Sequence, residues 1–452
     1  MSRTSSDAAF RRAFSIAVVS LVVLCGLFLG LSYAQGPKLE SAQVDADLVT
    51  STSGQTVRFF ANQALEEVTR EEVSITPPAP FSVSTSGEIV AITFAERLSY
   101  DTDYTVTVVD ARSAFGGSAS TLTHTFRTGT PALHYLHRDD GWDTILDTTL
   151  SGSTSGEMYS ATRIQDFAVV TPTVFAVVMV TDSATSQLNI VDTSSGLVED
   201  VGLPTDGVIG SFGASDSGTV LGFEFTSVDG AFDRTLFTLD LDRGRDLVPV
   251  PGLDGEPVSA RNWMFVPGSE RLIVQTTEQV VLQIDEEGSI QPLGSFLRIG
   301  DLSPDGTVLT VYDTFGASAL TLATLETTRL DASPVEGLDA TAGQIVVLPD
   351  GSRVQKVAVF DEPTGRFRSL IVADDGTSAR ALYETPQSLG SIESFTVSPN
   401  AQFVAIEVIP DFSASVTDGY ELNPRSTSVQ TVIVHLATGA VVRSVEGFAL
   451  DW

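Results

Sequence analysis

Apolar and polar residues alternate in short runs along most of the chain after residue 35. The stretch from Leu297 to Arg329 shows the pattern well. It has an apolar run, a Ser-Pro-Asp-Gly turn at Ser303–Gly306, a second run, a short loop and a third run. Alternation of this kind favours strands, because helices space their apolar residues three and four positions apart. No long stretch after residue 35 has the helical spacing, so we expect an all-β protein.

The same unit recurs throughout residues 131–452. Its main landmark is a turn rich in Pro, Asp and Gly after the first strand, and these residue types suit the dihedral angles of tight turns. Successive copies are roughly 40–50 residues apart, which is the period of four-stranded propeller blades. The turns are Ser215–Gly218, Pro267–Glu270, Ser303–Gly306, Pro349–Ser352 and Ser398–Ala401.

The two ends of the repeat region complement each other. Residues 132–161 supply three strands without an inner one, and Gly447–Trp452 is a short apolar strand without a blade of its own. Insertion of the last strand into the first blade closes a ring without free edges. We therefore expect a seven-bladed β-propeller, with six blades as the alternative because the unit Val258–Phe296 is short. The Ser-Pro-Asp-Gly turns resemble propeller repeats of the TolB and WD families, although no Trp-Asp pairs end the blades.

Residues 36–130 predict a separate domain of six or seven short strands, the size of an immunoglobulin-like sandwich. Tyr104, six residues after Leu98, predicts a corner in which the tyrosine hydroxyl bonds back to the preceding loop. The stretches Val57–Gln63, Leu98–Val108 and Thr125–Gly129 resemble the bacterial Ig-like domains of the SbsA type. That resemblance implies a spacer or adhesion module without catalytic residues.

The N-terminus contains an uncharged apolar run from Phe14 to Tyr33, preceded by Arg3, Arg11 and Arg12. Its length matches the roughly 30 Å hydrocarbon core of a bilayer, and the arginines favour a cytoplasmic N-terminus. We expect residues 1–13 to be a cytoplasmic tail and residues 14–33 a single-pass anchor in the cell membrane, with the bulk of the chain outside the cell. The alternative is a signal segment that is cleaved after Ala34, which would give a secreted protein.

The charge composition of the chain limits the kinds of partner that it can bind. The chain has 25 Lys and Arg against 58 Asp and Glu, a net charge of −33. Such a charge repels nucleic acids and anionic lipid headgroups and favours a monomer, so we expect no nucleic-acid partner. The chain has one cysteine, Cys25, so no disulfide can form within it.

Three motifs invite a catalytic or metal-binding interpretation, and each is incomplete. His134 and His137 are three positions apart on a predicted strand, so they point to opposite faces and cannot share an ion. Asp240–Asp246 lacks ligands that a calcium loop requires. Gly213–Ser217 lacks the second glycine of a nucleophile elbow. We expect no catalytic residues, no metal and no cofactor.

The best candidate surface lies in the connections between second and third strands, which gather on one side of a propeller. Three of these connections are longer than a hairpin needs: Thr226–Thr235, Asp361–Ser369 and Pro410–Ser428. Aromatic side chains beside charged ones are typical of binding hot spots. The candidate binding residues are Asp229, Phe232, Asp233, Arg366, Asp411, Phe412, Tyr420 and Arg425.

These features together predict a membrane-anchored extracytoplasmic binding or scaffold protein. Its propeller would recognise another envelope protein or a cell-wall glycan, with the Ig-like domain as spacer. One alternative is a propeller-fold glycosidase or lyase that uses carboxylates in the channel. The mostly apolar inner strands Ile299–Leu302, Gln344–Leu348 and Ile392–Val397 disfavour that alternative. Another alternative is a structural component of the cell surface.

Overall fold

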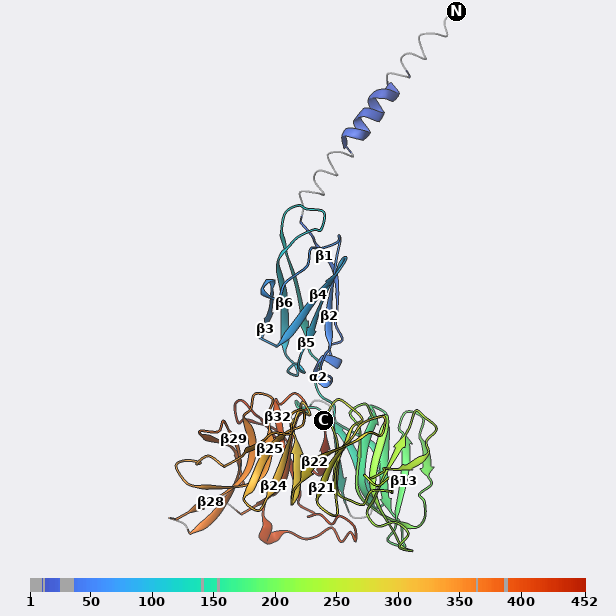
Figure 1. Ribbon diagram of the computed structural model, residues 1–452, viewed down its shortest axis with the longest axis vertical. Coiled ribbons are helices and arrows are strands. Elements are labelled where there is room, and N and C mark those ends of the chain that lie inside the picture. The colour runs from blue at the N-terminus through green and yellow to red at the C-terminus, as the bar shows by residue number, and fades with distance from the viewer. Residues whose placement is uncertain are drawn as a thin grey trace, which may run out of the picture. The chain divides into compact units, whose positions relative to one another are not determined.

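The computed structural model describes residues 10, 13–24, 36–139, 142–152, 155–362, 365–385 and 389–452, without the side chains of Ser155, Asp361 and Arg366. The chain divides into two compact units, the first ending at Gly129 and the second running from Thr130 to Trp452 (Figure 1).

Residues 13–24 form a helix with exposed side chains. Within the described ranges, no helix is both long and apolar enough to cross a membrane. The remainder of the expected anchor, the single cysteine at Cys25 and the cleavage motif that ends at Ala34 lie outside the described residues.

The first unit consists of two antiparallel sheets that share one core. Along β5 the side chains of Val90, Ile92 and Phe94 are buried, and the residues between them are partly exposed. This alternation follows from the period of two along a strand and directs one face of each sheet inward. The first sheet has the order β1 (Leu39–Gln43), β2 (Thr56–Ala61), β5 (Ile89–Phe94) and β4 (Phe81–Ser86), and the second has β3 (Val73–Thr76), β6 (Asp103–Ala111) and β7 (Ser120–Arg127), with the short helices α2 (Leu48–Ser51) and η1 (Arg70–Glu72) between strands.

A tyrosine fixes one corner of this unit. Tyr104 is buried at the start of β6, and its hydroxyl accepts a hydrogen bond of 3.2 Å from the backbone N–H of Ser99. The prediction that this tyrosine bonds back to the preceding loop is confirmed.

In the described part of the second unit, the strands form seven four-stranded antiparallel sheets, which we number in chain order. The strands of each sheet, from the first to the fourth, are β35 (Phe448–Asp451), β8 (Leu133–Arg138), β9 (Asp143–Thr148) and β10 (Ser155–Ala161) in sheet 1; β11 (Ile164–Thr171), β12 (Val174–Val180), β13 (Ser186–Asp192) and β14 (Leu197–Val201) in sheet 2; β15 (Gly207–Ala214), β16 (Val220–Ser227), β17 (Thr235–Asp240) and β18 (Leu247–Pro249) in sheet 3; β19 (Ala260–Phe265), β20 (Leu272–Thr276), β21 (Val280–Ile284) and β22 (Ile290–Ser295) in sheet 4; β23 (Arg298–Leu302), β24 (Val308–Asp313), β25 (Gly316–Thr321) and β26 (Thr327–Arg329) in sheet 5; β27 (Ala340–Val347), β28 (Arg353–Asp361), β29 (Arg366–Asp374) and β30 (Ala379–Glu384) in sheet 6; and β31 (Ser391–Val397), β32 (Phe403–Ile409), β33 (Gln430–His435) and β34 (Val441–Glu446) in sheet 7. A short helix, η3 (Phe412–Ala414), lies in the connection between β32 and β33.

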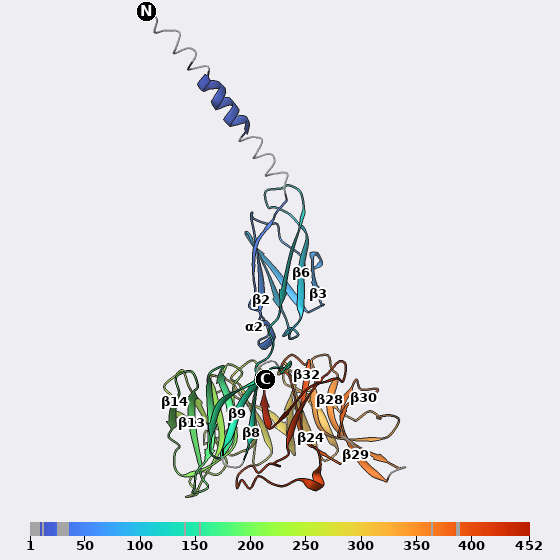
Figure 2. The same cartoon turned by 180° about the vertical axis from the view of Figure 1, so that it is seen from behind.

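Sheet 1 takes its first strand from the far end of the unit. β35 pairs with β8, with Phe448 opposite Leu136 and Asp451 opposite His134 (Figure 2). The prediction that the last strand joins the first sheet is therefore confirmed.

Each sheet packs on the next through its apolar faces. Leu188 of sheet 2 shares a core with Phe223 of sheet 3, and Phe448 of sheet 1 shares one with Phe167 of sheet 2. Between sheets 5 and 6, the hydroxyl of Tyr312 donates to the carbonyl of Gly343 at 2.8 Å. The first strands of neighbouring sheets lie beside one another, as β11 does with both β15 and β35. Sheets that follow one another around a centre in this way form a β-propeller.

The turn after the first strand is fitted to its neighbour as well as to its own sheet. Gly306 in sheet 5 has a φ of +69°, and a Cβ there would lie 2.9 Å from Val266 Cγ1 of the preceding turn. Glycine is therefore needed both for the left-handed conformation and for the close approach.

Candidate functional site

One face of the propeller is defined by the topology of its sheets. Because the strands are antiparallel, the connections from second to third strands emerge at the same end as the connections from each sheet to the next. We call this surface the 2–3 face. It includes all three connections that the sequence singles out.

Exposed aromatic side chains of the propeller gather on this face. Five aromatic residues in the described part of the second unit are exposed, at fractions from 45% to 85%. Each lies in a connection between second and third strands or beside one. They are Trp142 in sheet 1, Phe315 in sheet 5, Phe360 and Phe367 in sheet 6, and Phe412 in sheet 7.

Four of these five residues belong to three consecutive sheets. The rings of Phe360 and Phe367 lie 5.0 Å apart between centroids. The backbone N–H of Phe412 donates to the carbonyl of Leu389, whose side chain is also exposed, as is that of Val416. Sheets 5–7 therefore carry six exposed apolar residues, Phe315, Phe360, Phe367, Leu389, Phe412 and Val416, in or beside connections on the 2–3 face, and we call this set the aromatic cluster.

Acidic groups accompany the aromatic residues. Asp411 accepts hydrogen bonds from the hydroxyl and the backbone N–H of Ser413, and these bonds lower the pKa of its carboxyl. Asp229 in sheet 3 accepts from the backbone N–H of Ala231, which likewise lowers its pKa. Asp233 is exposed on the same connection. The lowered pKa values mean that Asp229 and Asp411 are charged at neutral pH.

The side chain of Phe232, in the same connection, packs against other aromatic residues of the protein. Its ring packs against Phe237 at 5.3 Å and Phe225 at 6.2 Å between centroids. Phe232 and Phe237 also line a groove of about 500 Å³ between sheets 2 and 3. Phe232 thus anchors its connection while Asp229 and Asp233 remain accessible.

The expected long loop Asp361–Ser369 is not a loop. β28 and β29 are each nine residues long, and Phe360 pairs with Phe367 in a regular ladder. The expectation was wrong because cross-strand aromatic pairing extends the hairpin beyond the buried core. Arg366 begins β29, and its side chain lies outside the described part of the structure.

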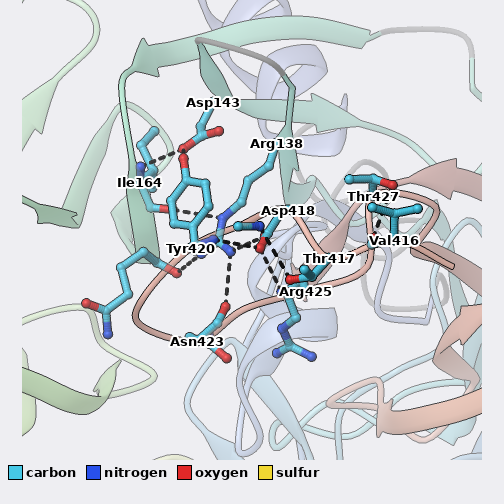
Figure 3. A network of polar contacts seen from close by, with 12 residues as sticks. Arg138, Asp143, Ile164, Val416, Thr417, Asp418, Tyr420, Asn423, Arg425 and Thr427 are labelled. Carbon is cyan, nitrogen blue, oxygen red and sulfur yellow. Dashed lines mark hydrogen bonds and ion pairs between the residues drawn. The ribbon is translucent and has the colours of Figure 1, made fainter.

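The connection Pro410–Ser428 is held down by a residue that the sequence did not single out, Arg138 at the end of β8 (Figure 3). Its guanidinium donates to Asp418 at 2.7 Å and to the carbonyl of Asn423 at 3.1 Å. It also donates to the carbonyls of Ile164, at 3.1 Å, and Gln165, at 2.9 Å. One side chain therefore joins sheets 1 and 2 to the connection between the second and third strands of sheet 7.

Tyr420 and Arg425 belong to the same network. The hydroxyl of Tyr420 donates to the carboxylate of Asp143, and its ring lies 4.0 Å from the guanidinium of Arg138 (Figure 3). Burial raises the pKa of Asp143, although its hydrogen bonds oppose the shift. Arg425 donates to Glu407 at 3.2 Å. Tyr420 and Arg425 therefore help to fix the connection, whereas Asp411 is half-buried and Phe412 is exposed.

Three first strands of the propeller sheets carry aspartates that the sequence analysis did not name as candidate site residues. Asp166 lies on β11, Asp301 on β23 and Asp451 on β35. Loss of solvation raises the pKa of all three, and it raises that of Asp166 to about 6 against the attraction of Arg425 and Arg138. Of the strands that we expected to be mostly apolar, Ile299–Leu302 contains one of these three carboxylates, that of Asp301. Among the residues that the structure describes, no group of three or more His, Cys, Asp or Glu side chains is arranged to hold a metal ion.

No protein-family model and no curated protein matches the chain. Solved structures do resemble it at low identity. TolB from Acinetobacter baumannii is 13% identical, over 78% of this chain and 79% of that one, with a TM-score of 0.37. Oligogalacturonate lyase in complex with manganese is 12% identical, over 89% and 98%, with a TM-score of 0.42. The β-propeller domain of the Trilobed protease from Pyrococcus furiosus is 11% identical, over 73% and 93%, with a TM-score of 0.42. Likenesses at this level carry no argument about function.

Proposed function

We propose that this chain is a binding and scaffold protein of the cell envelope, and that its propeller recognises another envelope protein through the 2–3 face. The observation that carries the proposal is the placement of all five exposed aromatic residues of the described propeller on that face. Buried aromatic side chains supply much of the binding energy at protein interfaces. Large apolar residues exposed together on one surface are uncommon unless a partner covers them.

A protein partner fits this surface better than a cell-wall glycan does. Four of the five exposed aromatic residues are phenylalanines, whose rings offer neither donors nor acceptors to hydroxyl groups. Three acidic residues lie on the same face, Asp411 next to Phe412 and Asp229 and Asp233 in sheet 3. The preferred partner therefore has apolar side chains surrounded by basic ones.

The proposal includes the finer organisation of the chain. The seven described sheets would be seven blades, closed by β35 in the first. The two-sheet first unit would be an Ig-like domain of the SbsA type that serves as a spacer. Residues 14–33 would anchor the protein with its N-terminus in the cytoplasm. This last point is supported by the uncharged run and the arginines before it, with cleavage after Ala34 as the alternative.

Crosslinking of tagged full-length protein in intact cells tests the binding role. The test variant carries Phe360→Ser, Phe367→Ser and Phe412→Ser. The matched control carries Leu197→Ser and Val441→Ser, which remove exposed apolar residues from the fourth strands of sheets 2 and 7. We expect wild type and control to capture one dominant envelope protein and the test variant to lose it. Equal capture by the test variant would refute a role for this face.

Hydrolysis or elimination on a glycan is the second candidate, favoured by the environment of Asp166. Its raised pKa of about 6 suits a general acid, and the nearby charge of Glu407, which Arg425 pairs, contributes to the shift. Two carboxyl groups with such different environments are the usual basis of acid–base catalysis on glycosidic bonds. Purified protein should then cleave a panel of cell-wall oligosaccharides, and Asp166→Asn should abolish cleavage. Absence of products with wild type would remove this candidate.

A further inference from the structure

A small pocket crosses the junction between sheets 1 and 7, and the backbone N–H of its wall residue Thr427 donates to the carbonyl of Val416 in the aromatic cluster at 2.9 Å. Its volume is about 250 Å³. His137 and Arg138 contribute from the end of β8, Gln430 from the start of β33, and Glu446 from the end of β34. Pockets for drug-sized ligands are about 300–1,000 Å³, so this one fits a smaller molecule.

Some polar groups of the pocket wall already have hydrogen-bond partners within the protein. Arg138 is paired with Asp418 and bonded to three backbone carbonyls. The hydroxyl of Ser426 is bonded to the hydroxyls of Ser415 and Ser428. These groups shape the pocket and have little capacity left for a ligand.

Three other wall groups keep free hydrogen-bonding capacity within the described structure. His137 Nδ1 lies 3.0 Å from the carbonyl oxygen of Glu446. Because a carbonyl can only accept, Nδ1 carries the proton and Nε2 remains an acceptor. The side-chain amide of Gln430 and the carboxylate of Glu446 have no hydrogen bond to described residues. Gln430 and Glu446 are also opposite each other on β33 and β34, so their side chains are close neighbours.

This set of groups selects the chemistry of the ligand. Arg138 and Asp418 compensate each other's charge, so the carboxylate of Glu446 remains as the uncompensated charge of these three groups, and it disfavours anions. A metal ion would find one uncommitted carboxylate where it needs several oxygen ligands. Hydroxyl groups fit, because each can donate to Glu446 or His137 and accept from the Gln430 amide.

We propose that this pocket binds a neutral polyhydroxylated ligand of monosaccharide size, either as a free sugar or as the end of a glycan chain. The proposed ligand is distinct from the protein partner proposed above. Its walls come from the first and the last sheet, so a bound sugar would hold the two ends of the propeller together. Ligand binding to the folded state should therefore raise the unfolding temperature.

The test uses the full chain with a panel of glucose, galactose and N-acetylglucosamine, with glycerol as the non-specific co-solvent control. Saturation-transfer NMR measures binding, and thermal unfolding measures stabilisation. The pocket variant is Gln430→Ala with Glu446→Ala. The matched control is Gln291→Ala with Glu287→Ala, which changes the same residue types on the exposed surface of sheet 4.

We expect at least one sugar to bind wild type and the matched control, and its affinity to fall at least tenfold in the pocket variant. Oligosaccharides that end in the same sugar then show whether the natural ligand is a free sugar or the end of a glycan chain. Binding of immobilised chains indicates a glycan end, and binding of the free sugar alone indicates a soluble metabolite. The proposal is overturned if no sugar binds, if the pocket variant binds as well as wild type, or if calcium or phosphate binds the pocket in place of the sugars.

Discussion

The side chains of Arg138 and Asp418 form an ion pair of 2.7 Å, although 280 positions separate them in the chain. Their exposed fractions are 4% and 8%, so the pair is removed from solvent. It joins the end of β8 in the first sheet to the connection between β32 and β33 in the last sheet. The pair therefore stabilises the place where the propeller must close on itself.

Arg138→Ala should lower the free energy of unfolding of the propeller by about 3–5 kcal/mol, because removal of one partner leaves a buried charge uncompensated. Urea unfolding followed by tryptophan fluorescence measures this, since Trp142, Trp263 and Trp452 all lie in the second unit. Glu199→Gln is the control. It breaks the exposed pair with Arg245 and should cost about 0–1 kcal/mol. Equal effects of the two variants would contradict the structural role of Arg138.

Gly306→Ala should destabilise the propeller more than Gly351→Ala. Both glycines occupy the turn after the first strand with positive φ, +69° and +84°. Each substitution incurs about 1–2 kcal/mol of backbone strain. Only the Cβ at position 306 also meets a neighbour, Val266 Cγ1 at 2.9 Å, and such overpacking costs about 1–3 kcal/mol more. Urea unfolding of the two variants should separate them, and similar losses would show that the neighbouring turn yields freely.

Asp166 should make the stability of the propeller depend on pH. Its pKa is raised from 3.8 to about 6 in the folded state, so the folded protein binds more protons than the unfolded chain between these values. The contribution of Asp166 to the free energy of unfolding is therefore fully present below about pH 4 and is lost as the pH rises through 6.

Asp166→Asn removes this titration and keeps an oxygen that can accept from the backbone N–H of Phe167. The variant should gain stability over wild type as the pH rises from 4 to 7, by on the order of 1–3 kcal/mol. Unfolding free energies of both proteins across that range give the difference directly. A difference that does not vary with pH would mean that Asp166 titrates normally.

Tyr104→Phe should weaken the first unit by about 0.5–1.5 kcal/mol, because it removes the hydroxyl that accepts from Ser99. The first unit contains no tryptophan, so hydrogen exchange of residues 36–129 is the suitable measurement. Exchange should accelerate in this unit and remain unchanged in residues 130–452. No change in either unit would mean that the corner bond contributes nothing to stability.

The sequence predicted features that depend on local chemistry. Turn residues such as Ser303–Gly306 mark the ends of strands because their dihedral angles are restricted. The apolar end of the chain predicted the pairing of β35 with β8, since an unpaired edge is unfavourable. Tyr104 was found by its spacing from Leu98.

Features that depend on distant contacts were not predictable. Nothing near Arg138 in the sequence indicates that its partners lie at Ile164 and Asp418. For the same reason, the contact between Asp143 and the hydroxyl of Tyr420, a predicted binding residue, was not foreseen. An aromatic residue in a long connection has the same local signature whether it packs inward or faces a partner. The extended pairing of Phe360 with Phe367 was missed because exposed hairpins lack the buried pattern of a core strand.

The pairing of β35 with β8 also means that the first sheet can be completed only after the last strand has been synthesised. β8 is among the first strands of the propeller to leave the ribosome, and β35 follows all the others. Until then the inner edge of β8 has no partner, and an open edge invites pairing with other chains. Closure between strands so distant in sequence is intrinsically slow. A chain interrupted before residue 448 would keep this edge open. The edge of β8 is therefore protected by β35 only when synthesis of the propeller has been completed.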